Sequence, residues 1–319
     1  MTDILITFGL MLLGLVLLAG GGEFLVRGAS RLARSLGISA LVVGLTVVAF
    51  GTSAPELAVG IAATLEGRHD LLLGNVIGSN IANVLLVLGL AAATRAMRVA
   101  LNLVKFDVPI MIFVVIAFML IAFSGSITRF AGVGLMLALL AYTCFTYFLS
   151  KREGPLVEKE YEEGVQRTTK PVMDVVLVLV GMAALKFGAD FIVLGAERIA
   201  EIFEISERII GLTVVAIGTS LPEVATAVVA ARRGQSDIAV GNIVGSNIFN
   251  ILAVVGVTAT VNPISVGRAI LIQDGTVMVL ATLLMLPILR TGQLVSRKEG
   301  FALLTAYAAY ITWTVLRPA

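Results

Sequence analysis

Residues 44–60, GLTVVAFGTSAPELAVG, recur 167 positions later as residues 211–227, GLTVVAIGTSLPEVATA, with 12 of 17 positions identical. A second block repeats at the same offset. Residues 74–90, GNVIGSNIANVLLVLGL, match residues 241–257, GNIVGSNIFNILAVVGV, at 10 of 17 positions. The shared offset indicates a duplicated chain whose halves carry the same two motifs.

The first pair of blocks places one carboxylate in each half, Glu56 and Glu223, inside a long apolar segment. An ionised side chain within hydrocarbon is costly and normally marks a functional site. Two of them at equivalent places of a duplicated membrane protein predict a binding site for a positive ion. The alternative is that each is a protonated carboxylic acid with a structural role.

The composition is that of a protein that crosses a membrane several times. The 319 residues are 58% hydrophobic and 14% charged, with a mean hydropathy of +1.02, whereas soluble domains have about 25% charged residues. The one cysteine, Cys144, excludes disulfides within the chain, and the one histidine, His69, lies in a short polar connection. We therefore expect a lipid-embedded chain without a cofactor, a nucleic-acid partner or an obligate protein partner.

Ten apolar segments approach the length of about 20 residues that a membrane span requires. The first lacks a basic start, so we interpret it as a retained helix and not as a cleaved signal. Five segments per half, an odd number, force the halves to insert with opposite orientation. The predicted fold is therefore an all-α membrane protein of two inverted five-helix repeats. The segments are 4–26, 39–65, 71–94, 104–124, 129–150, 172–196, 208–231, 238–260, 269–289 and 299–316.

The halves meet in one hydrophilic stretch. Residues 1–150 are predicted to form the first repeat, residues 151–170 a cytoplasmic linker, and residues 171–319 the second repeat. With both termini outside, 16 of the 23 Lys and Arg residues fall in cytoplasmic loops and 6 in outer loops, while Lys186 lies inside a span. This excess predicts a multi-pass protein of the cell membrane with its N- and C-termini outside.

The second and seventh helices are predicted to be broken at the GTSxPE motifs. Pro55 and Pro222 have no backbone N–H, and their rings clash with the carbonyl four residues back. Carbonyls freed near Ala49–Gly51 and Ala216–Gly218 are tolerated at membrane depth only around a cavity or an ion. Further oxygens come from Thr52, Ser53, Glu56, Thr219, Ser220 and Glu223. Oxygen ligands of these kinds suit Ca²⁺ and Na⁺.

The second blocks add a polar stripe to each half. Polar residues recur there at intervals of four, which stacks them on one face of a helix. They are Asn75, Ser79 and Asn83 in the first half and Asn242, Ser246 and Asn250 in the second. The alternative is that these residues, with Asn80 and Asn247, only join helices by hydrogen bonds. Small residues beside them, Gly74, Gly78, Gly241 and Gly245, would allow a close approach to the broken helices.

Two more acidic residues occupy equivalent places, Glu23 and Asp190, again 167 positions apart. Glu23 has Arg27 one helical turn on, and Asp190 has Lys186 one turn back, so both are expected to form ion pairs within a helix. For Lys186, a role in ion access or in competition with the ion is the alternative.

The paired motifs, GTSAPE with GNVIGSNIANV and GTSLPE with GNIVGSNIFNI, resemble the α-repeats of the cation/Ca²⁺ exchanger superfamily. The similarity is greatest to the prokaryotic sodium/calcium exchangers and covers essentially the whole chain. It implies ion sites at the membrane centre between the second, third, seventh and eighth helices, with the first and sixth helices sliding as gates. The implied ion ligands are Ala49, Thr52, Ser53, Glu56, Ser79, Asn83, Ala216, Thr219, Ser220, Glu223, Ser246 and Asn250.

One position departs from part of that superfamily. Some of its members, potassium-dependent exchangers among them, have Asp where this chain has Asn250. With Asn at 83 and 250, the site keeps two carboxylates, which argues against potassium dependence and leaves the sodium stoichiometry open.

The expected function is antiport of Na⁺ and Ca²⁺ by alternating access, and not an enzymatic activity. Proton/calcium exchange is the first alternative, because a proton can neutralise a buried carboxylate as a metal ion does. A passive cation channel is the second. An intramembrane hydrolase is the third, although Ser53 and Ser220 have no histidine or lysine base nearby in the sequence.

Overall fold

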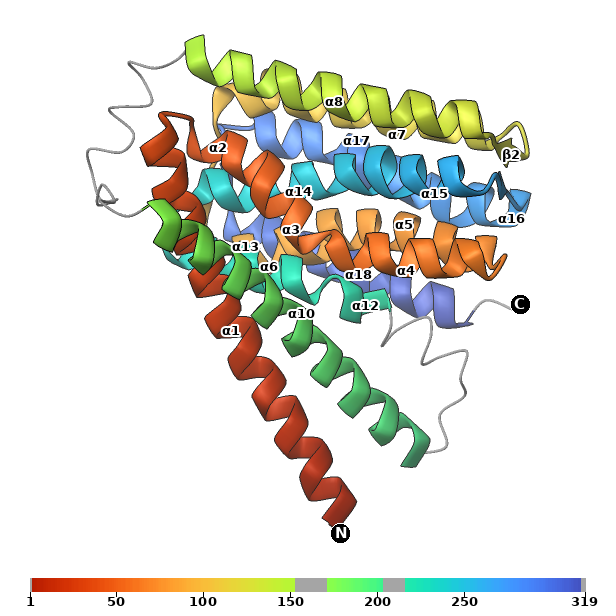
Figure 1. Cartoon of the computed structure of the whole chain (residues 1–319), viewed down its shortest axis with the longest axis horizontal. Coiled ribbons are helices and arrows are strands. Elements are labelled where there is room, and N and C mark those ends of the chain that lie inside the picture. Colours follow the sequence, from red (N-terminus) through yellow and green to blue (C-terminus); the bar gives the residue numbers. More distant parts are fainter. Residues whose placement is uncertain (1, 153–170, 203–215, 317–319) are drawn as a thin grey trace.

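The computed structural model describes residues 2–152, 171–202 and 216–316. Helices make up almost all of this part of the chain, and most run side by side in one bundle that two long helices, α1 and α10, cross obliquely (Figure 1). Within the described residues, seven helices are long and apolar enough to cross a membrane, and the bent segment 40–65 makes an eighth. The protein is thus an all-α membrane protein.

The helices of the first half are bounded as follows: α1 Thr2–Leu36, α2 Ala40–Val43, η1 Gly44–Val48, α3 Ala49–Thr52, α4 Ala54–Leu65, α5 His69–Ala82, η2 Asn83–Val87, α6 Leu88–Thr94, η3 Leu103–Asp107, α7 Val108–Ala122 and α8 Arg129–Arg152. Those of the second half are α10 Pro171–Ile202, α12 Ala216–Thr219, α13 Leu221–Arg232, α14 Ser236–Phe249, η5 Asn250–Val255, α15 Gly256–Val261, α16 Arg268–Ile270, η6 Leu271–Gly275, α17 Thr276–Arg290 and α18 Arg297–Leu316. Here η marks a π-helical turn.

Two of the ten predicted spans are not among these seven or eight. Segment 208–231 begins in residues 208–215, outside the described part of the chain. Segment 299–316 is present as α18, but it is not among the helices that are apolar enough to count. The predicted linker lies outside the described residues from 153 to 170, between the end of α8 and the start of α10.

Two small strand pairs join the halves, and the sequence did not predict them. β1 (Met97–Arg98) pairs with β4 (Leu294–Val295), and β2 (Ser126–Ile127) pairs with β3 (Ile264–Ser265), both antiparallel. Met97 begins β1 and Ile264 begins β3, and they are 167 positions apart, the offset of the repeat. Each pair therefore joins one strand of the first half to one strand of the second, and the two pairs are equivalent. The short connections between helices are thereby tied together across the duplication.

Small residues bring α1 and α10 into backbone contact. A Cβ atom added to Gly21 would lie 2.8 Å from the backbone nitrogen of Leu185, and one added to Gly181 would lie 2.6 Å from that of Leu25. Only glycine allows this approach, which is the packing that membrane helices use in place of a hydrophobic driving force. α1 and α10 are therefore in close contact along their length, and α1 also packs on α13 through Gly22.

Candidate ion-binding site

The GTSxPE segment of the first half breaks its helix as the proline predicts. α3 ends at Thr52 and α4 begins at Ala54, with a bend of 44° between residues 40–52 and 54–65. Pro55 lies in the first turn of α4, where its missing N–H leaves no helical bond unmade. The second half repeats this arrangement, because α12 and α13 meet at Ser220 with a proline in the first turn of α13.

The backbone at the two breaks differs in one hydrogen bond. The N–H of Ser53 donates to the carbonyl oxygen of Ala49 at 3.0 Å, so the break does not leave that carbonyl without a donor. The equivalent N–H, of Ser220, instead donates to the carbonyl of Ile217 at 3.1 Å. Ala216, the predicted counterpart of Ala49, begins α12. The duplicated sequences therefore present different carbonyls at their breaks.

The two carboxylates lie in the first turns of the helices that follow the breaks. Glu56 in α4 and Glu223 in α13 are each 1% exposed, and they are close enough to repel each other. The positive end of a helix dipole favours an anionic group at this position. The hydroxyl of Ser53, in the first half, donates to Oε1 of Glu223, in the second half, at 3.3 Å. Residues from both halves thus meet at one carboxylate.

Hydrogen bonds join each broken helix to the polar stripe of the other half. Thr52 donates to Oδ1 of Asn242 at 3.1 Å, and its hydroxyl lies 3.3 Å from that of Ser246. The equivalent bond of the other half runs from Thr219 to Oδ1 of Asn75 at 3.4 Å. The predicted stripes therefore do face the breaks, and Asn75 and Asn242 act there as hydrogen-bond partners.

A second pair of bonds crosses between the stripes. The amide nitrogen of Asn83 donates to Oδ1 of Asn247 at 3.2 Å, and that of Asn250 donates to Oδ1 of Asn80 at 3.3 Å. Asn83 and Asn250 also begin the π-helical turns η2 and η5, a feature that often marks functional sites. Because their amide groups are used as donors, the side-chain oxygens of Asn83 and Asn250 stay available.

Buried oxygens without a hydrogen-bond partner gather among the predicted residues. Such groups are rare in native proteins, and each asks for an explanation. Of the 13 buried side-chain atoms without a partner in the described residues, seven are oxygens of the predicted set. They are Oε1 and Oε2 of Glu56, Oε2 of Glu223, Oγ of Ser79 and Ser220, and Oδ1 of Asn83 and Asn250. A bound cation would supply the positive partner that these oxygens lack.

The cluster has two formal charges. No three His, Cys, Asp or Glu side chains of the described chain come together in a way that could hold a metal ion. A transition metal that prefers nitrogen or sulfur ligands is therefore a poor fit. Hard cations that accept hydroxyl, amide and carboxylate oxygens match the residues present.

Two further buried acidic residues, Asp107 and Asp274, occupy equivalent positions of the two halves and were not among the predicted site residues. Asp107 is 2% exposed and accepts a hydrogen bond from the hydroxyl of Tyr142 at 3.0 Å. Asp274 is 9% exposed and accepts one from Tyr310, also at 3.0 Å. Their separation of 167 positions, the offset of the repeat, was the signal that could have found them.

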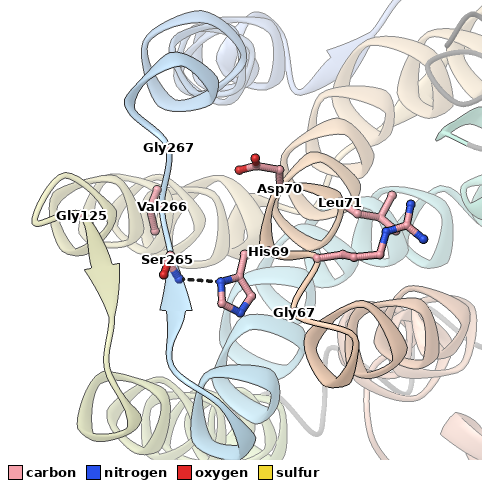
Figure 2. A pocket seen from close by; sticks show the side chains of 9 residues that line it. Gly67, His69, Asp70, Leu71, Gly125, Ser265, Val266 and Gly267 are labelled. Atoms are coloured by element: carbon pink, nitrogen blue, oxygen red, sulfur yellow. Dashed lines mark hydrogen bonds between the residues drawn. The ribbon is translucent and has the colours of Figure 1, made fainter.

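A surface pocket of about 620 Å³ lies apart from this cluster, between the loop from α4 to α5 and the loop from β3 to α16 (Figure 2). Within it, Nδ1 of His69 accepts a hydrogen bond from the backbone N–H of Ser265 at 3.0 Å. Of the twelve predicted site residues, none lines this pocket. This pocket is therefore separate from the buried carboxylates of the candidate site.

Comparisons with known proteins identify the family of the chain. Residues 6–148 and 173–316 each match the family described as sodium/calcium exchanger protein. The candidate antiporter CaxA of Alkalimonas amylolytica is 40% identical to this chain, with 94% of this chain and 96% of that protein covered. The sodium/calcium exchanger MaX1 of Methanosarcina acetivorans is 34% identical, with 97% and 98% covered. A structure of the sodium-calcium exchanger NCX_Mj, soaked without Na⁺ and Ca²⁺, matches with a TM-score of 0.83 at 30% identity and covers 98% of this chain and 99% of its own.

Proposed function

The chain belongs to the sodium/calcium exchanger protein family of cation antiporters, and we propose that it exchanges Na⁺ for Ca²⁺ by alternating access. One observation carries the proposal. Glu56 and Glu223 are buried together between two broken helices, and most of their oxygens have no hydrogen-bond partner. Two carboxylates carry a charge that one Ca²⁺ or two to three Na⁺ roughly neutralise.

The proposed ion ligands are the twelve residues that the sequence indicates. Carboxylates supply charge, hydroxyl and amide oxygens complete the shell, and the broken backbone adds carbonyls. In the first half they are Ala49, Thr52, Ser53, Glu56, Ser79 and Asn83, and in the second Ala216, Thr219, Ser220, Glu223, Ser246 and Asn250. The available oxygens of Asn83 and Asn250 favour these two residues over their neighbours Asn80 and Asn247, which accept hydrogen bonds instead.

Coupling between the ions follows from the charge of the site. Moving two bare carboxylates past apolar helices would carry a desolvation penalty of several kcal/mol for each ion. A site loaded with Ca²⁺ or Na⁺ avoids most of that penalty, so the empty site stays in place and exchange is obligatory. If three Na⁺ move against one Ca²⁺, one net charge crosses and the rate depends on voltage.

We also propose the finer architecture of ten spans in two inverted repeats, residues 1–150 and 171–319, joined by a cytoplasmic linker at 151–170, with both termini outside. The cross-paired strands and the matching breaks at Ser53 and Ser220 support two equivalent halves. The close packing of α1 on α10 supports a gate that moves as one body.

Calcium uptake by the purified chain in reconstituted vesicles tests the function. We expect an outward sodium gradient to drive uptake of ⁴⁵Ca²⁺, and an outward proton gradient of equal size to drive much less. Uptake should not need potassium on either side. Uptake driven by protons but not by sodium would instead identify a proton/calcium exchanger with the same site.

Asn250→Asp should change the ion preference without abolishing binding. The side-chain oxygen of Asn250 has no partner, and its amide donates to Asn80, so a carboxylate would add a third negative charge and lose one bond. We expect the ratio of the Na⁺ affinity to the Ca²⁺ affinity to change by about 10-fold, which corresponds to about 1.4 kcal/mol. Otherwise the affinity ratio should depend on pH in a different way from that of the unaltered chain. Isothermal titration at pH 6 and pH 8 measures both. An unaltered profile would place this side chain outside the site.

A further inference from the structure

Lys186 and Asp190 form an ion pair in the middle of α10, with 2.5 Å between Nζ and Oδ2. Their side chains are 54% and 53% exposed. α10 is long and strongly apolar, and it is one of the helices suited to cross a membrane. Two half-exposed charges at its centre therefore need an environment other than hydrocarbon.

The neighbours of α10 show which way this pair faces. Met182 lies against Gly51 beside the first break, and Val193 lies against Gly218 beside the second. At about 100° per residue, Lys186 lies about 40° around the helix from Met182 and about 20° from Val193. Lys186 is thus at the edge of the face of α10 that is turned toward the two broken helices, and Asp190, about 80° around the helix from Met182, lies further toward the exposed side.

The opposite flank of α10 is occupied by α1. Gly181, Leu185 and Gly188 pack on its backbone and side chains, and they lie on a different face from Lys186 and Asp190. Lipid is a poor solvent for the exposed part of either charge. The exposed surface of the pair is therefore best solvated by water that reaches the side of the broken helices.

The equivalent acidic residue on α1 is bonded to a neighbouring helix. Glu23, 167 positions before Asp190, pairs with Arg27 at 2.9 Å and accepts a bond from Nε of Arg233 at 2.7 Å. Arg233 is the C-cap of α13, so this bond holds α1 to the second broken helix. Among the described residues, Asp190 pairs only with the lysine on its own helix. Within the described part of the chain, no bond equivalent to that between Glu23 and Arg233 joins Asp190 to another helix.

We propose that Lys186 and Asp190 line the aqueous access path to the carboxylates, and that Lys186 sets the preference between Na⁺ and Ca²⁺. This rests on the proposed function, because it assigns a role within the same exchange. The energy of a fixed positive charge is proportional to the charge of the approaching ion. Lys186 therefore opposes Ca²⁺ twice as strongly as Na⁺, and Asp190 offsets that effect by holding the ammonium group.

Charge removal at either residue tests the preference. For Lys186→Gln we expect the half-saturating Ca²⁺ concentration to fall about 10-fold and that of Na⁺ about 3-fold, a ratio of logarithms near two. Asp190→Asn leaves the lysine uncompensated and should raise both values, with the logarithm of the Ca²⁺ change again about twice that of the Na⁺ change. Raising the salt concentration should shrink both effects. Equal shifts for the two ions, or shifts of the same sign in both variants, would overturn the proposal.

Labelling tests the access path without requiring transport. Cys144→Ser removes the one cysteine, and Lys186→Cys or Val180→Cys then adds a single thiol. Val180 is 46% exposed and lies on another face of α10, so it serves as the lipid-facing control. A charged, membrane-impermeant methanethiosulfonate reagent should modify position 186 at least 10-fold faster than position 180.

The two experiments separate two kinds of failure. Equal labelling rates at positions 186 and 180 would show that the pair does not face water, whatever the chain transports. Fast labelling at 186 in a protein without sodium-driven Ca²⁺ uptake would overturn the proposed function and leave the access path standing. The assigned preference would then fall with that function.

Discussion

Replacing Glu56 or Glu223 with glutamine should reduce Ca²⁺ exchange by about 100- to 4,000-fold. Removing one charge from a buried set of compensating charges typically costs about 3–5 kcal/mol, and each 1.4 kcal/mol is tenfold in affinity. Neither oxygen of Glu56 has a hydrogen-bond partner, so Glu56→Gln removes charge without removing a bond of the fold. Folding should therefore survive where transport does not.

Thermal unfolding in detergent separates binding from folding in these variants. Saturation at 100 times the dissociation constant stabilises the native state by about 2.7 kcal/mol, so Ca²⁺ should raise the Tm of the unaltered chain. Glu56→Gln should keep the Tm measured without Ca²⁺ and lose the increase. Asp70→Asn is a matched control, because Asp70 is exposed beside the pocket of Figure 2 and away from the buried carboxylates. Near-normal Ca²⁺ flux in Glu56→Gln would contradict the site.

The carboxylates and the helix breaks could be predicted because each has one physical cause. A charge inside an apolar segment is rare, and a proline four residues after a glycine cannot complete the helix. The duplication extended both predictions to the second half of the chain, since two copies of one motif share a fold. These arguments predicted breaks near residues 49–51 and 216–218 with Glu56 and Glu223 beside them, and the structure has the breaks slightly later, at Ser53 and Ser220.

The choice among neighbouring asparagines could not be made from spacing. A π-helical turn inserts one residue and turns the following side chains by about 100° relative to an α-helix. Asn83 and Asn250 begin such turns, and nothing in residue type announces them. The pairing of Glu23 with Arg27 was predicted and is confirmed. Its second partner could not be predicted from the sequence, because Arg233 is 210 positions away and binds Glu23 only once α1 has packed on α13.

Gly21→Leu should lower exchange at least 10-fold, whereas Gly20→Leu, one residue earlier, should have little effect. A Cβ atom at Gly21 would lie 2.8 Å from the backbone nitrogen of Leu185 and 2.9 Å from the carbonyl of Gly181, so α1 and α10 must separate. A Cβ atom at Gly20 meets nothing within 4 Å. Overpacking of this kind typically costs about 1–3 kcal/mol.

The pair of leucine variants also distinguishes movement from binding. If α1 and α10 carry the gate as one unit, separating them should slow exchange while Glu56 and Glu223 still bind Ca²⁺. Gly21→Leu should then show a lower Tm but retain the increase in Tm that Ca²⁺ produces. Equal exchange rates in Gly20→Leu and Gly21→Leu would mean that the tight packing of these helices serves neither folding nor movement, because both variants add the same side chain to the same helix.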